Sequence, residues 1–169
     1  MIILQTDRLI LRRLSAGDAE FILELLNQPS FLRHIGDKGV RSTDEAVNYI
    51  QTGPLASYER FGFGLYLVEL KDKAVPIGIC GLLKRDSLPD VDVGFAFLPD
   101  YWSRGYAFEA AAAVINYGKE VLGLRRIVAI TSLDNEASIK LLEKLGLKFE
   151  GLIKLGEDQR EVRLFGTSW

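Results

Sequence analysis

The sequence predicts an α/β protein in which a mixed central β-sheet of about seven strands carries helices on both faces. Three observations lead to this fold class. Segments with the apolar spacing of strands alternate with segments that have helical spacing, capping residues stand between them, and 48% of the 169 residues are hydrophobic. No repeat or low-complexity segment interrupts the pattern, so we expect residues 1–169 to form one domain, which is long enough to bury a real core.

The amino-terminal part predicts one strand followed by two helices. Residues 4–14 mix apolar and polar side chains at a period near two, which is typical of a strand. We expect helices over residues 16–28 and 43–59, the second broken near Pro54, with residues 29–39 as a loop between them. Each helix starts with the spacing of a capping box, in which a serine precedes the helix and an acid follows three residues later: Ser15 with Asp18, and Ser42 with Glu45.

The remaining elements alternate between strands and helices. A helix is expected to begin beside Gly105 and to end near Val121, and a second one to end at Gly146, where a left-handed cap is needed. β-Branched residues around Val128 predict a short buried strand. Strands are expected over residues 63–70, 75–85, 91–99, 125–133, 147–156 and 160–168, and the second helix over residues 134–146.

Composition excludes several classes of function. The 21 basic and 23 acidic residues give a net charge of -2, which argues against a general nucleic-acid binder. The single cysteine, Cys80, can form no intrachain disulfide, and no CxxC metal motif is present, so we expect no metal. No run of about 18 apolar residues predicts a membrane span, and the first residues do not have the pattern of a signal peptide. We therefore expect a cytoplasmic protein with no membrane partner.

The segment SRGYA lies between a predicted strand and the long alanine-rich helix. A helix start leaves about four backbone N–H groups without partners, and a phosphate can bind them if the chain allows close approach. Gly105 permits that approach, and Arg104 adds a forked donor suited to phosphate oxygens. The alternative is an ordinary turn glycine with a solvated arginine. Neither GxGxxG nor GxxxxGK[ST] is met, which argues against a dinucleotide or P-loop enzyme.

The same segment resembles motif A of the GNAT acetyltransferases, Q/R-x-x-G-x-G/A. WSRGYA has Gly105 and Ala107 in register, and Trp102 stands where many members have Gln or Arg. YWSRGYAFEA is similar to the YWGKGYATEA that the ribosomal-protein N-terminal (RimJ/RimL-like) branch favours. Four further segments resemble that branch in the same order, so the resemblance covers nearly the whole chain: LQTDRLILRRLSAGDAEFI, IGICGL, DVGFAFLPDYW and DNEASIKLLEKLGLKFEG.

This resemblance implies a GNAT fold with a cofactor cleft between two splayed parallel strands, the fourth and fifth in our count. It implies direct transfer of an acetyl group from acetyl-CoA, as co-substrate and without a metal, to a primary amine. The acceptor would be a small molecule or a peptide, a protein or peptide N-terminal α-amine included. A non-catalytic acyl-CoA-binding or regulatory module on the same fold is the alternative. Both a monomer and a homodimer are compatible with the sequence.

The resemblance also implies which residues bind acetyl-CoA. Backbone N–H groups at the helix start would hold the pyrophosphate. Two strand residues would lie beside the pantetheine arm, with a free N–H that could polarise the thioester oxygen; the alternative is ordinary strand core. The expected cofactor contacts are Phe97, Leu98, Ser103, Arg104, Gly105, Tyr106, Ala107, Phe108, Asn135 and Ser138.

For three polar residues the resemblance implies a role in binding or catalysis, and each also has a purely structural alternative. Asn135 would reach the coenzyme arm, or it is simply a helix N-cap. Ser138 would donate a hydrogen bond to the departing thiolate, or it is an ordinary residue of a first helical turn. Asp92 would act as a catalytic base through water, or it is a solvated acid of the turn that also contains Asp86 and Asp90. These acids would suit a cationic acceptor, although turns are often acidic.

Overall fold

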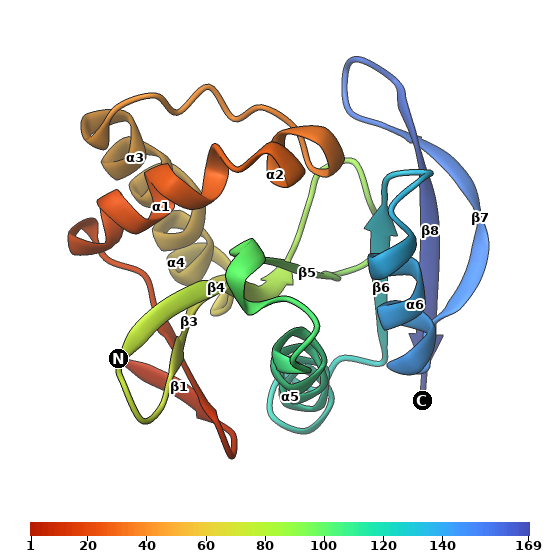
Figure 1. The fold of residues 1–169 in the computed structure, drawn as a ribbon. Helices are drawn as coiled ribbons and strands as arrows, with labels where there is room; N and C mark the ends of the chain where they lie inside the picture. Colours follow the sequence, from red (N-terminus) through yellow and green to blue (C-terminus); the bar gives the residue numbers. More distant parts are fainter.

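The computed structural model describes residues 1–169, and its strands form one mixed sheet of eight (Figure 1). Neighbouring strands follow the order β1-β2-β3-β4-β5-β6-β8-β7, and all pairs are antiparallel except β5 with β6. The predicted fold class is thereby confirmed. The strands are β1 (Ile2–Gln5), β2 (Leu9–Arg13), β3 (Leu65–Leu70), β4 (Val75–Leu83), β5 (Asp92–Phe97), β6 (Arg126–Thr131), β7 (Lys148–Leu155) and β8 (Arg160–Ser168).

Helices cover both faces of the sheet, as the sequence predicts (Figure 1). One face carries α1 (Ala19–Leu26), α2 (Pro29–His34) and α3 (Thr43–Ile50), and the other carries α5 (Tyr106–Glu120) and α6 (Glu136–Lys144). The short helix α4 (Ala56–Phe61) contributes Tyr58 to the core layer on the α5 side. A π-helical turn, Gln51–Leu55, joins α3 to α4, and short 3-10 turns lie at Ala16–Asp18 and Pro99–Tyr101. None of these helices combines the length and apolar character needed to cross a bilayer.

The core consists of two layers, one on each side of the sheet, because successive strand residues point to opposite faces. On β3, Leu67 packs against the α1–α3 side whereas Val68 packs against the α5 side. The α5 helix lies close to the sheet because its inward residues are small, and Ala110 and Ala111 are fully buried. Cys80 is buried in this apolar layer, which raises the pKa of its thiol and excludes it as a nucleophile.

Two predictions about the amino-terminal part were wrong. Residues 4–14 do not form one strand, because Thr6 interrupts them: its hydroxyl accepts a hydrogen bond from the Leu9 N–H, 3.1 Å, and the chain turns back as the β1–β2 hairpin. This hairpin accounts for the eighth strand. The expected loop over residues 29–39 begins with a helix, α2, because Pro29 occupies its first turn, where a missing N–H costs nothing.

Candidate functional site

The strands β5 and β6 separate soon after they meet. They are in register only where Asp92 faces Val128, beside a hydrogen bond of 3.0 Å from the Val128 N–H to the Val91 carbonyl. Beyond this point the two strands diverge, and we call this divergence the fork (Figure 1). The predicted splaying of the fourth and fifth strands is therefore confirmed, with β5 and β6 as the strands concerned.

The backbone of β5 presents hydrogen-bonding groups to the fork. The Leu98 N–H donates to the Ile77 carbonyl, 2.9 Å, on the β4 side. Since backbone groups of an antiparallel strand point to alternate sides, the N–H groups of Phe95 and Phe97 face β6. The register between β4 and β5 continues without a bulge, and the Trp102 indole donates to the Phe97 carbonyl, 2.8 Å. Of the two strand residues that we expected beside pantetheine, only Phe97 keeps its N–H for a ligand.

The start of α5 has unpaired backbone donors. The first bond of this helix runs from the Glu109 N–H to the Gly105 carbonyl, 3.0 Å, and no side chain caps the helix. The N–H groups of residues 103–108 therefore have no acceptor within the protein. Ser103 and Gly105 have φ values of 61° and 83°, in the left-handed region, and both are exposed. Backbone amides in such an alternating conformation form a concave site suited to an anion.

Arg8 braces this helix start, a role that sequence reasoning missed. Its Nη1 donates to the Arg104 carbonyl at 3.0 Å, its Nε pairs with Glu109 Oε1 at 2.7 Å, and its guanidinium lies 4.4 Å from the centre of the Tyr106 ring. The Thr6 hydroxyl and the Arg8 N–H also donate to Glu109. The only signal in the sequence was the acid in the first turn of the helix, and nothing indicated its partners about 100 residues earlier.

Hydrogen bonds determine the charge of Glu109. Burial by itself would raise the pKa of this carboxyl. The hydrogen bonds from Thr6 and Arg8, together with the charge of Arg8, outweigh that effect and hold the pKa below its ordinary value of 4.5. Glu109 is therefore ionised at neutral pH and fastens the β1–β2 turn to α5.

The start of α6 differs, because Asn135 caps it. Its Oδ1 accepts a hydrogen bond from the Ser138 N–H at 3.3 Å, so the N-cap interpretation of Asn135 is confirmed. The Asn135 amide nitrogen and the half-buried Ser138 hydroxyl have no protein partner and stay available to a ligand. At the far end of α6, Lys144 Nζ lies 4.4 Å from the centre of the Phe108 ring, so the two helices meet beside the fork.

Asp92 is buried, and its interpretation as a solvated turn acid was wrong. Its side chain is 1% exposed, Oδ1 accepts from Arg85 Nε at 3.0 Å, and Oδ2 has no partner. Burial raises the pKa of Asp92, and the charges of Arg85 and Lys84 oppose the increase. Because Val93 packs toward α5, the neighbouring Asp92 side chain lies on the face that α1–α3 cover.

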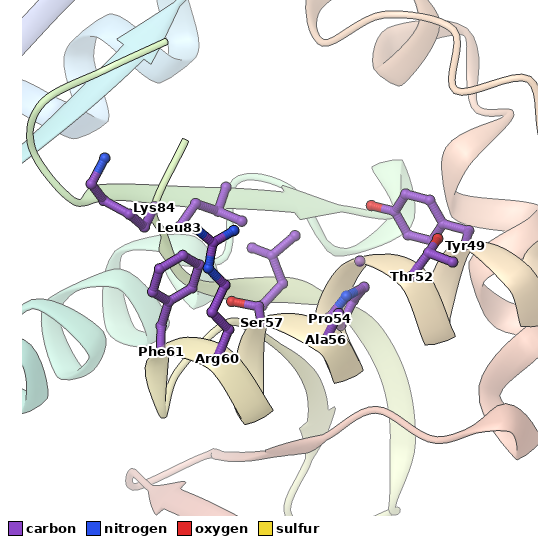
Figure 2. Close-up of a pocket in the computed structure, with 11 residues that line it drawn as sticks. Tyr49, Thr52, Pro54, Ala56, Ser57, Arg60, Phe61, Leu83 and Lys84 are labelled. Atoms are coloured by element: carbon purple, nitrogen blue, oxygen red, sulfur yellow. The ribbon is translucent and has the colours of Figure 1, made fainter. Parts of the chain in front are cut away.

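A pocket of about 270 Å³ lies on this same face (Figure 2). Leu65 and Leu83 form part of its wall, and Leu83 is the register partner of Asp92 on the neighbouring strand. A second pocket, of about 420 Å³, shares Tyr49 and Thr52 with the first. The other lining residues of the first pocket are Gly53, Pro54, Ala56, Ser57, Arg60, Phe61 and Lys84. No group of three His, Cys, Asp or Glu side chains has the arrangement of a metal site.

Comparisons with known proteins agree with this geometry. A family model described as an acetyltransferase (GNAT) domain matches residues 8–148. YoaA of Bacillus subtilis (strain 168), named as an uncharacterized N-acetyltransferase, is 34% identical over 154 residues, which cover 90% of this chain and 86% of YoaA.

Solved structures share the fold. A GNAT-family acetyltransferase from Bacillus anthracis superposes with a TM-score of 0.80 at 25% identity, over 99% of this chain and 98% of that one. RimL, described as a ribosomal L7/L12 alpha-N-protein acetyltransferase in complex with coenzyme A, superposes with a TM-score of 0.84 over 99% and 98% of the two chains. Its identity is 19%, so this likeness concerns the fold. The sequence match and the relatives together show that the chain belongs to the GNAT family and is an acetyl-CoA-dependent N-acetyltransferase.

Proposed function

We propose that this enzyme acetylates the N-terminal α-amine of a protein or peptide, with acetyl-CoA bound along the fork and the start of α5. The observation that carries the proposal is the set of unpaired N–H groups at residues 103–108, next to strands that separate. The fold likeness to RimL, whose description names a protein N-terminal substrate, supports the acceptor class.

The coenzyme is bound mainly by backbone groups in this proposal. Its pyrophosphate accepts hydrogen bonds from the helix start, where the helix dipole adds partial positive charge. Exposed Arg104 supplies a further charge, and its carbonyl is held by Arg8. The Phe97 N–H faces the pantetheine arm, whereas Leu98, whose N–H is already bonded to Ile77, offers only its side chain.

The acetyl transfer needs little assistance from side chains. A peptide α-amine titrates near pH 8, so a useful fraction is neutral at pH 7. Its nitrogen attacks the thioester carbonyl, the new C–N bond replaces the C–S bond, and the amine proton leaves through water toward Asp92. The Ser138 hydroxyl donates to the departing sulfur, which gains a proton from water. Asp92 suits its role because burial raises its pKa, which makes its carboxylate a better base than an exposed one.

An acceptor screen tests the proposal. The purified protein is incubated with acetyl-CoA and a panel of peptide N-termini, polyamines, aminosugars and amino acids, and released thiol is measured. We expect turnover with peptide α-amines. If the protein binds acetyl-CoA but releases no thiol with any amine, the non-catalytic module is the better description.

The Asp92→Asn variant tests the base. We expect kcat/KM for the amine to fall about 100-fold, the usual range for one general base, while the affinity for acetyl-CoA is unchanged. In the parent, kcat/KM should rise with pH through the raised pKa of Asp92, and this acid limb should disappear in the variant. Asp90→Asn is the matched control. Asp90 lies two residues before Asp92 and is likewise paired with an arginine, Arg126, at 3.2 Å. Equal effects of the two substitutions would argue against a base at Asp92.

A further inference from the structure

We infer that the acceptor carries an anionic group, a carboxylate or a phosphate, near the amine that is acetylated, and that Lys38 and Arg160 bind it. The inference deepens the proposed function and rests on it. It depends on two cations from distant segments, Lys38 and Arg160, that form no ion pair with a carboxylate.

A hydrogen bond to the backbone joins the segments that carry Arg160 and Lys38. Arg160, at the start of β8, donates from Nη1 to the Ile35 carbonyl at 2.9 Å, which holds the β7–β8 hairpin against the segment after α2. Lys38 lies three residues beyond Ile35 in that segment. Neither Lys38 nor Arg160 takes part in any ion pair of the structure.

Arg85, which is itself paired with Asp92, adds a third positive charge near Lys38. Loss of water around the ammonium lowers the pKa of Lys38, and the positive charges of Arg85 and Arg160 lower it further. Repulsion between like charges lowers the stability of the folded protein, and a bound anion would relieve it. Such an arrangement is common at binding sites, where the ligand supplies the missing charge.

Three carboxylates near these cations are held in ion pairs with arginines. Asp92 is bound by Arg85, Asp90 by Arg126, and Asp37 by Arg41 at 2.6 Å. Glu45 accepts from the Arg41 N–H and the Ser42 hydroxyl. Arginines therefore neutralise two of the three acids, Asp90 and Asp92 but not Asp86, that had suggested a cationic acceptor.

Two adjoining pockets connect Lys38 to the face of the sheet on which Asp92 lies. Lys38 lines the pocket of about 420 Å³, which shares Tyr49 and Thr52 with the pocket beside Leu83. Asp44 and Glu45 also line the larger pocket. In Figure 2, Tyr49 projects from α3 toward the strands, and its hydroxyl has no hydrogen-bond partner in the structure. An acceptor with its amine near Asp92 can therefore extend past Tyr49 toward Lys38.

The test compares tetrapeptide amides that differ only at the second residue. Ser-Asp-Ala-Ala, Ser-phosphoserine-Ala-Ala, Ser-Asn-Ala-Ala and Ser-Lys-Ala-Ala are acetylated under identical conditions, and kcat/KM is measured by thiol release. We expect at least a tenfold preference for an anionic peptide over the Asn peptide, and the Asp and phosphoserine arms identify which anion is bound.

Charge-removing variants assign the preference to the cluster. The Lys38→Gln, Arg160→Gln double variant should reduce the anionic peptide to the level of the Asn peptide without changing the KM for acetyl-CoA. The control Lys154→Gln removes one charge from exposed β7 and should leave the preference intact. A parent enzyme with no preference, or with one for the Lys peptide, would overturn the inference, as would a preference that survives in the double variant.

A binding measurement separates this inference from the proposed function. Fluorescence anisotropy of carboxy-terminally labelled Asp, phosphoserine and Asn peptides is recorded with coenzyme A present. If no peptide is acetylated, the proposed function fails, yet tighter binding of an anionic peptide still supports the anion site. Equal binding of all three peptides contradicts the anion site even where acetylation occurs.

Discussion

The two helices that follow the strands of the fork begin in different ways. After β6, Asn135 caps α6 by accepting a hydrogen bond from the Ser138 N–H. After β5, Gly105 stands at the corresponding position of α5 and has no side chain with which to cap. The N–H groups of α6 are thus partly satisfied by the protein, whereas those of α5 are left to solvent or to a ligand.

In the proposed function, this difference allows a ligand site to be built from an incomplete helix start. A side-chain cap stabilises a helix by about 1 kcal/mol, and its oxygen occupies the space that an anion would need. The α5 start instead gains its rigidity from outside the helix, through Arg8 and Glu109, so that its backbone donors remain free.

Gly105→Val should remove the site at α5. Its φ of 83° disfavours any side chain, and even a Cβ would lie 3.2 Å from Arg8 Nη2. Each lost charged hydrogen bond costs about 1.5–3 kcal/mol, so we expect the Kd for coenzyme A to rise by roughly 100-fold. The matched control is Gly123→Val, where φ is 71° and no atom lies within 4 Å of the added Cβ. Calorimetry should show similar losses of stability in the two variants, and an unchanged Kd in Gly105→Val would contradict the site.

Ser138→Ala tests whether the free hydroxyl at α6 acts on the leaving group. Since Oγ has no protein partner, we expect the melting temperature to be unchanged. Loss of one hydrogen bond to a developing anion should lower kcat about tenfold, with little change in the KM for acetyl-CoA. Steady-state kinetics at saturating amine provide the measurement. A drop in stability without a change in kcat would assign Ser138 to the helix alone.

Glu109→Gln should loosen the brace of α5. The Arg8–Glu109 pair is partly exposed, so we expect a loss of about 0.5–1 kcal/mol and a weakening of coenzyme A binding by roughly fivefold. The pKa of Glu109 is lowered in the folded protein, so its contribution is complete above its ordinary value of 4.5 and is lost as the pH falls through the lowered value. The difference in melting temperature between parent and variant should therefore be largest near pH 7 and should shrink below pH 4.5. A difference that does not depend on pH would exclude the charge as its cause.

Substitutions at Asn135 separate capping from ligand binding. Asn135→Ala removes the cap and should cost about 1 kcal/mol in the free energy of unfolding. Asn135→Asp keeps an acceptor for the Ser138 N–H but replaces the amide donor with a charge, so stability should be retained. If the free amide contacts coenzyme A, the aspartate variant should raise the KM for acetyl-CoA a few fold. Denaturant titration and steady-state kinetics of the two variants distinguish the cases.

Much of the helix placement, including the helix start that we propose as the cofactor site, could be predicted from the sequence. The signals are local: Gly105 follows a strand and precedes an alanine-rich run, Asn135 precedes an amphipathic turn, and Gly146 provides the left-handed end of α6 with a φ of 93°. The same locality explains the errors. A period near two does not reveal a turn at Thr6, and Pro29 starts helices as readily as it ends them.

The family, the alternation of strands and helices, and the helix start that we assign to the coenzyme can all be inferred from the sequence, because each depends on neighbouring residues and short motifs. Three other features depend on the folded chain: the brace from Arg8 to Glu109, the burial of Asp92 against Arg85, and the approach of Arg160 to the segment of Lys38. These contacts join segments far apart in the chain. A single sequence does not indicate which distant charges will pair. The pairing depends on how the folded sheet brings its strands and loops together.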